Sequence, residues 1–163
     1  MKAFLDIETS FYGEITVVGI YYPPDEVIQL VGDEVNRTSI ARALDKADII
    51  LTYNGSRFDL PVIRRRTGLD ISRLWTHRDL MLDCWKCGLK GGLKRIEELL
   101  GIKRASKGVD GWMAMKLWHS WERCGDREAL EKLLEYNRDD VVNLELLERK
   151  LEEIARPGSK TDE

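Results

Sequence analysis

The first 31 residues hold three strand-like segments joined by very short turns. Residues 2–8, 14–22 and 26–31 are rich in Val, Ile and aromatic side chains, which favour strands. Residues 10–13 and 23–25 supply the turn-forming types Ser, Gly, Pro and Asp. Such short joints connect antiparallel neighbours, so we expect an antiparallel meander to open the domain.

The chain then alternates helical and strand patterns. Ser39 is placed to cap a helix over residues 40–47, which leads into a strand over residues 48–53. A helix over 58–66 and a fifth strand over 79–82 follow. Strands in the first half with helices around them predict an α/β domain built on one mixed five-stranded sheet.

The second half shows apolar side chains at helical spacing. We expect helices over residues 93–100, 112–123 and 127–154. Because Asn favours helix caps over helix interiors, the last helix is expected to break or bend near Asn137. The domain is expected to span residues 1–155, with residues 156–163 as a flexible tail.

Length and composition agree with one compact domain. The chain has 163 residues, of which 43% are hydrophobic and 34% are charged, unlike disordered or fibrous chains. No apolar run approaches the roughly 18 residues that cross a bilayer. Asp6 and Glu8 stand where a secretory signal would be apolar, so we expect a cytoplasmic protein with three reduced cysteines.

Charge is unevenly distributed, although the net charge is only −3. Residues 61–108 hold twelve Lys and Arg residues against five Asp and Glu residues. Two interpretations are open: a positive face that follows a nucleic-acid backbone, or helix faces that are simply solvated. The candidate backbone contacts are Arg64, Arg65, Arg66, Lys90, Lys94 and Lys107.

Asp6 and Glu8 lie two residues apart in a strand and therefore point to the same face. Two acids this close in an interior strand resist joint ionisation unless a cation offsets their repulsion and desolvation. Carboxylate oxygens suit Mg²⁺ or Mn²⁺ better than zinc. The alternative is an edge strand on which both acids are merely solvated.

Three more residues become informative in combination with this pair. Asp59 follows a strand and begins a helix. The alternative explanation is that an acid at this position only interacts favourably with the helix dipole. Tyr136 and Asp140 are four apart and share a helix face, a spacing that is also common by chance on surfaces. Four carboxylates in this order within an α/β layout are enough to hold two divalent ions.

The segments FLDIETS, LTYNGSRFDLPVI and YNRDDV resemble, in this order, the three motifs of the DnaQ-like, or DEDD, 3′–5′ exonuclease family, whose fold is ribonuclease H-like. The segments GLKGGLKRIEELLGI and EYNRDDVVNLELL resemble more narrowly the YprB-like branch of that family. The similarity covers roughly residues 1–155.

This resemblance implies a metal-dependent exonuclease that releases nucleoside 5′-monophosphates from single-stranded DNA or RNA 3′ ends. Two divalent ions, Mg²⁺ or Mn²⁺, would serve as cofactors. Tyr136 matches the aromatic residue of the Tyr-type subclass. The His-type subclass does not fit, because there is no His near Asp140. The family's metal-binding carboxylates fall on Asp6, Glu8, Asp59 and Asp140.

The resemblance also implies a role for each residue. Asp6 would touch both ions, while Glu8 and Asp140 would complete the site of the attacking water. Asp59 would steady the leaving-group ion through water. Tyr136 would orient the nucleophile, because a usual pKa of about 10 makes it a poor base at neutral pH.

A further set of residues is predicted to bind the substrate. Thr9, the residue after the motif's Glu, matches a position near the 3′-terminal nucleotide. Phe58, Phe11 and Tyr12 are either stacking partners for bases or core residues. The candidate substrate-binding set is Thr9, Phe58, Arg64, Lys90 and Lys94.

Two other functions stay open. A ribonuclease H-like, structure-specific endonuclease also uses clustered acids, but it does not explain Tyr136 four residues before Asp140. A catalytically silent module would bind nucleic acid or dock on a helicase or polymerase.

Cysteine and tryptophan patterns indicate packing rather than chemistry. Cys84 and Cys87 form a CxxC pair that, with Cys124 and a His, has zinc-ligand chemistry, but a second ligand pair is missing. We expect a packed helix face instead. Trp118 and Trp121, three apart, indicate a buried helix stripe rather than a stacking platform.

Overall fold

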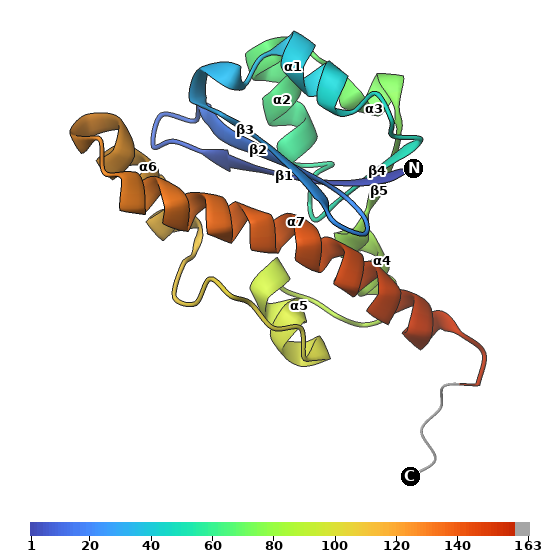
Figure 1. Cartoon of the computed structure of the whole chain (residues 1–163). Helices are drawn as coiled ribbons and strands as arrows, with labels where there is room; N and C mark the ends of the chain where they lie inside the picture. The colour runs from blue at the N-terminus through green and yellow to red at the C-terminus, as the bar shows by residue number, and fades with distance from the viewer. Residues whose placement is uncertain (159–163) are drawn as a thin grey trace.

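A twisted five-stranded sheet forms the centre of the protein, whose computed structural model describes residues 1–158 (Figure 1). The strand order is β3-β2-β1-β4-β5. The first three strands form an antiparallel meander, and β4 and β5 add in parallel. This confirms the predicted mixed sheet. The strands are β1 (Lys2–Thr9), β2 (Ile15–Tyr22), β3 (Glu26–Val31), β4 (Ile49–Thr52) and β5 (Thr76–Asp79).

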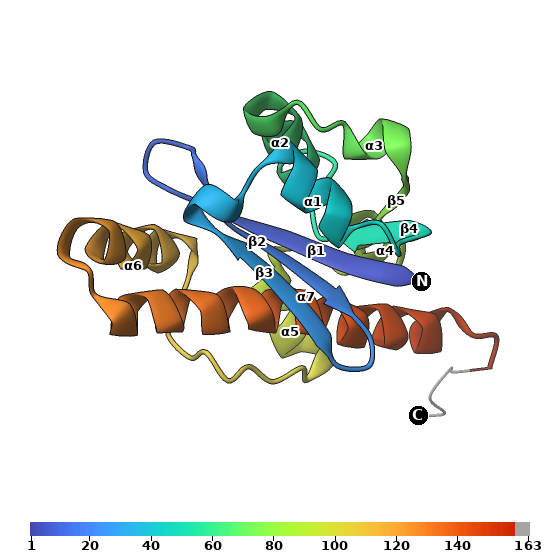
Figure 2. The ribbon, with the colours of Figure 1, turned by 45° about the horizontal axis from the view of Figure 1, so that its top comes forward.

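Helices cover both faces of the sheet (Figures 1 and 2). One face carries α1 (Arg37–Ala43), α2 (Asp59–Thr67) and α3 (Ile71–Leu74), after a short 3₁₀ turn, η1 (Gly32–Glu34). The other face carries α4 (Leu80–Lys86), α5 (Leu93–Leu100), α6 (Gly111–Cys124) and α7 (Arg127–Ala155). None of these helices is long and apolar enough to cross a membrane.

Alternation along β1 decides which side chains face α7. Ala3, Leu5 and Ile7 are buried in the core under α1, α2 and α3. Phe4 lies in the opposite core, which α4, α5 and α7 complete. Because side chains two apart share a face of a strand, Asp6 and Glu8 follow Phe4 onto the α7 side.

Two predicted element boundaries are wrong because an acid or amide side chain caps a helix earlier than expected. The fifth strand is Thr76–Asp79 rather than residues 79–82, since Asp79 is the N-cap of α4 and accepts a hydrogen bond from Met81 N (3.1 Å). Asn36, not Ser39, caps α1 and accepts from Ser39 N (2.9 Å). Both side chains satisfy backbone donors that a helix start leaves free.

The prediction of a break near Asn137 is also wrong. Helix α7 runs unbroken over 29 residues, and the Asn137 side chain is fully buried in its middle. Its amide is satisfied by partners from β1 and β3, so it does not compete for the helix backbone. Gly19 of β2 makes room for it, because a Cβ there would lie 2.2 Å from Asn137 Oδ1.

The described chain continues a short way past the end of α7 at Ala155. Arg156 ends that helix in an extended conformation, and Pro157 and Gly158 form a turn. Of the predicted tail, residues 159–163 lie outside the residues that the structure describes.

Candidate active site

The site is built on the second half of β1, where β4 no longer covers it. β4 pairs with β1 only from Lys2 to Phe4, so the β4 side of the strand is open beyond that point. Asp59, the first residue of α2, fills part of this gap, and its Oδ2 accepts a hydrogen bond from Ile7 N (3.1 Å). An unpaired buried backbone N–H is costly, so Asp59 also stabilises the strand.

Helix α7 crosses β1 and contributes the remaining polar groups. Asn137 Nδ2 donates to Asp6 Oδ2 (3.3 Å) and to the Asp6 carbonyl (3.4 Å). Gln29 Nε2 donates to Asn137 Oδ1 (3.0 Å) and fixes the orientation of the amide. Sequence reasoning assigned Asn137 no role here, although it interrupts the apolar stripe of α7.

Three of the four predicted carboxylates converge closely. Asp6, Glu8 and Asp140 each offer an oxygen, and these oxygens lie within 4.8 Å of one another. Glu8 and Asp140 are buried, and Asp6 is partly buried. Asp59, also buried, lies outside this group of three but raises the pKa of both Asp6 and Glu8 through its charge.

The acids strongly perturb one another. Burial raises the pKa of Asp6 and of Glu8 well above their usual range, and the charge of Asp140 raises both further. Burial raises the pKa of Asp59 to about 7, against the lowering effect of the Ile7 N–H. Burial also raises the pKa of Asp140 to about 6, against the lowering effect of Arg104. Negative charge is thus confined where water screens it poorly.

These residues fit hard divalent cations. The three clustered ligands are carboxylates, the donors that Mg²⁺ and Mn²⁺ prefer. Glu8 Oε1 is buried and has no hydrogen-bond partner, as expected of an oxygen whose partner is a cation. Within residues 1–158, no other group of three His, Cys, Asp or Glu residues comes as close.

Tyr136 lies beside the carboxylates in a cavity of about 260 Å³, which Asp6 and Asp140 also line. Burial and then the charges of Asp140, Glu8 and Asp6 raise the pKa of its hydroxyl. The phenol therefore stays protonated at neutral pH. Lys94 Nζ lies 5.2 Å from the centre of the ring, within cation–π range.

Arg104 is a site residue that sequence reasoning did not single out. Its Nη2 donates to Asp140 Oδ1 (2.5 Å) and to Glu97 Oε1 (2.9 Å), and its Nε bonds the other Glu97 oxygen. Asn143 Nδ2 also donates to Glu97 Oε1 (3.2 Å). Glu97 is 2% exposed, so the guanidinium neutralises a buried acid and holds Asp140 at once. Arg104 lies in an irregular segment, where no periodicity marks it.

The predicted substrate-binding residues do not all lie at this cavity. Lys94 lines it, Thr9 ends β1 directly after Glu8, and Phe58 is 43% exposed immediately before Asp59. Lys90 is exposed in the segment before α5.

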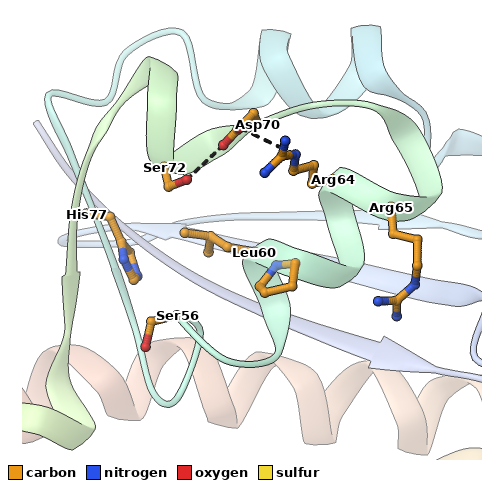
Figure 3. A pocket seen from close by; sticks show the side chains of 8 residues that line it. Ser56, Leu60, Arg64, Arg65, Asp70, Ser72 and His77 are labelled. Atoms are coloured by element: carbon orange, nitrogen blue, oxygen red, sulfur yellow. Dashed lines mark hydrogen bonds and ion pairs between the residues drawn. The ribbon is translucent and has the colours of Figure 1, made fainter.

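Arg64 instead lines a separate cavity of about 420 Å³ with Arg65 and His77 (Figure 3). There it pairs with Asp70, with Arg64 Nε 3.5 Å from Asp70 Oδ2. None of the four predicted metal ligands lines that cavity.

The predicted helix packing of cysteine and tryptophan agrees with the structure. Cys84 is buried in α4, and burial raises the pKa of its thiol to about 11. Trp118 is buried between α6 and α7, with Trp121 packed against the same cluster. Neither pattern contributes to the acidic site.

A mixed five-stranded sheet in this order, flanked by helices, fits the ribonuclease H-like fold. The chain belongs to the RNase_H superfamily, whose family model RNase_H_2 matches residues 3–152. A comparison with curated proteins found no match.

Solved structures show the same fold. The chain is similar to the family B DNA polymerase from the hyperthermophilic archaeon Pyrobaculum calidifontis, with a TM-score of 0.68 and 18% sequence identity. The match covers 92% of this chain and 24% of the polymerase chain, so this chain spans about a quarter of that protein's length.

The raised pKa values predict how the stability of the metal-free protein depends on pH. In the folded protein the buried acids keep their protons up to a higher pH than in the unfolded chain, where they lose them above about pH 4. The free energy of unfolding therefore falls as the pH rises from about 4 towards the raised pKa of Asp59, about 7. We expect the melting temperature of the metal-free protein to decrease from pH 5 to about pH 8. At pH 8, Mg²⁺ or Mn²⁺ should raise it again.

Asp6→Asn tests the origin of both effects. Removing one of the clustered acids should raise the melting temperature of the metal-free protein at pH 8 and abolish most of the shift with metal. Asp33→Asn, at an exposed acid, is the matched control and should leave both unchanged. The assignment fails if Asp6→Asn retains the metal-induced shift of the parent.

Arg104→Met should destabilise the protein by about 3 kcal/mol, because it leaves Glu97 buried without its cation. The double variant with Glu97→Met should lose clearly less than the sum of the two single losses. Urea unfolding at pH 7 measures both. Arg95→Met, at an exposed arginine of α5, is the control and should change stability by less than about 0.5 kcal/mol. Additive losses in the double variant would contradict the ion pair.

Proposed function

We propose that this protein is a 3′–5′ exonuclease of the DnaQ-like, Tyr-type class, and that it releases nucleoside 5′-monophosphates from single-stranded DNA or RNA. The observation that carries the proposal is the convergence of Asp6, Glu8 and Asp140 beside Tyr136. Asp6 and Glu8 come from β1, and Tyr136 and Asp140 come from one face of α7.

In this proposal Asp6, Glu8, Asp59 and Asp140 hold two Mg²⁺ or Mn²⁺ ions. Such ions, when bound, stabilise the charge on the attacking and leaving oxygens of a phosphodiester and lower the pKa of water. The charges of Asp140, Glu8 and Asp59 all act on Asp6, and the family resemblance implies that Asp6 would touch both ions. Asp59, at the start of α2, would serve the ion on the leaving-group side.

Tyr136 contributes a hydrogen bond rather than a base. Its raised pKa keeps the hydroxyl protonated, so it can donate to, or orient, the attacking water but cannot remove a proton from it at neutral pH. Asp140, one helical turn away, is held by Arg104, whose charge offsets part of the rise in the carboxyl pKa that burial causes.

The substrate is expected to approach over Lys94, Thr9 and Phe58. Lys94 lines the cavity and would supply positive charge for the scissile phosphate. Phe58 presents a partly exposed ring before Asp59, and Thr9 follows Glu8 at the end of β1. Lys90 belongs to the same proposal as a contact to the backbone farther from the cut.

Two alternatives make different predictions. A structure-specific endonuclease needs the acids but gives no role to Tyr136 four residues before Asp140. A silent module that docks on a helicase or polymerase gives no role to the perturbed acids, which destabilise the fold unless a cation offsets them. The exonuclease accounts for both observations.

Digestion of 5′-labelled single-stranded DNA and RNA of the same sequence tests the proposal. With Mg²⁺ or Mn²⁺ we expect a ladder that shortens one nucleotide at a time from the 3′ end. Asp6→Asn should reduce the rate by at least about 100-fold, while Asp33→Asn should cut at the parental rate. Internal cuts would indicate the endonuclease, and no cleavage with either metal would indicate the silent module.

Tyr136→Phe isolates the hydroxyl. Because only the positioning of the nucleophile is lost, kcat should fall about 10- to 100-fold with little change in KM. The pH at which the rate is half-maximal should not move, since the phenol does not titrate in the working range. Steady-state kinetics from pH 6 to about 9 measure all three quantities. A shifted pH profile would instead identify Tyr136 as a proton acceptor.

A further inference from the structure

Two exposed aromatic side chains contact each other and are close in the chain to residues of the acidic site. Phe11, in the loop between β1 and β2, is 42% exposed, and Trp112, in the first turn of α6, is 57% exposed. Exposing this much aromatic surface forgoes the stabilisation of burial. Apolar surface of this kind beside a site often marks a binding surface.

The two rings form a defined pair. Their centroids lie 5.2 Å apart in an edge-to-face arrangement of 63°. His119, two turns along α6, contacts the same Phe11 ring at 5.9 Å. Lys116 Nζ lies 5.4 Å from the centre of the Trp112 ring, so a cation stands beside the pair. Trp112, Lys116 and His119 therefore share one face of α6.

The loop that carries Phe11 is held in place. Ser10 Oγ accepts hydrogen bonds from the backbone N–H groups of Tyr12 and Glu14, both at 3.2 Å. Arg66 Nη2 of α2 donates to the Tyr12 carbonyl at 3.1 Å. Gly13 has a φ of 73°, which the turn requires. A ring on such a loop loses little conformational entropy when it binds a ligand.

Both rings are close in the chain to residues of the acidic site. Asp110 and Gly111, directly before Trp112, line the acidic cavity together with Asp6 and Asp140. Phe11 follows Glu8 and Thr9 by only a few residues along β1 and its loop. The β1–β2 loop and α6 lie at the same end of the molecule in both views (Figures 1 and 2).

We propose that Phe11 and Trp112 form a stacking site for a nucleobase upstream of the 3′-terminal nucleotide of a single strand, with Lys116 near the adjoining phosphate. This inference rests on the proposed function, because it places the strand end at the acidic cavity. Stacking on exposed aromatic rings beside cations is how proteins hold single strands without reading sequence. A base paired in a duplex is already stacked, so the site selects for unpaired ends.

Binding of oligonucleotides that lack one base locates this site. The probes are 5′-fluorescein DNA strands with a single abasic position at the second, third or fourth nucleotide from the 3′ end, beside the intact strand. All protein variants carry Asp6→Asn, and EDTA is present, so the strands stay intact. Fluorescence anisotropy gives Kd for the Asp6→Asn protein and for its combinations with Trp112→Ala, Trp112→Phe and Leu74→Ala.

We expect one abasic position to weaken binding to the Asp6→Asn protein about 10-fold. Trp112→Ala should weaken binding of the intact strand by a similar factor and make that abasic position neutral. Trp112→Phe should restore part of both effects. Leu74→Ala removes an exposed apolar side chain from α3, on the other face of the sheet. Its Kd values should equal those of the Asp6→Asn protein.

Two outcomes would overturn the stacking site. In the first, every abasic position changes Kd by the same factor, both in the Asp6→Asn protein and in its combination with Trp112→Ala. The other is a Trp112→Ala variant that binds normally but changes the oligomeric state in light scattering, which would make the patch an interface between copies of the chain. Because the assay needs no cleavage, the expected pattern in a protein that never digests DNA would support the stacking site and defeat the exonuclease.

Discussion

Repulsion among buried carboxylates at one point of the central strand is the constraint around which the rest of the site is arranged. Asp6, Glu8 and Asp140 are brought together where burial disfavours their charges. The protein offsets only part of this cost, through the Asn137 amide and the Arg104 guanidinium. A fold that retains such a group of acids gives up stability at the site, as functional sites commonly do.

The sheet leaves space for that arrangement. Since β4 ends its pairing at Phe4, the second half of β1 has one strand neighbour and one open side. Asp59 reaches Ile7 across the open side, and α7 covers the face. A longer β4 would satisfy the same backbone groups but would leave no room for a carboxylate there. The short β4 therefore makes room for Asp59, and Asp59 satisfies the backbone group that β4 leaves unpaired.

Much of this fold was accessible from local patterns, and so were the acids. β-Branched residues and short turns located the meander, and period-two spacing placed Asp6 and Glu8 on one face. The errors occurred where one side chain outweighed the pattern: Asp79 ended β5 by capping α4, and Asn36 started α1 early. Such competition depends on single hydrogen bonds, which periodicity does not encode.

The partners of the acids were less accessible, for a related reason. Arg104 meets Asp140 across 36 positions of sequence, and Asn137 meets Asp6 across 131. Neither residue type predicts such a contact, since Arg is common on surfaces and Asn is common in loops. The Phe11–Trp112 pair is likewise formed by a loop and a helix far apart in the chain.

The unbroken course of α7 has a consequence for how this site can vary. Tyr136, Asn137 and Asp140 belong to one rigid rod, so their relative directions are set by helix geometry rather than by loops. Inserting one residue just before Tyr136 would rotate the preceding part of the helix, residues 127–135, about 100° against the three of them. Either the packing of Leu133 or the placement of all three side chains would then be lost. Extending the helix beyond Leu151 carries no such penalty, so length change is confined to its far end.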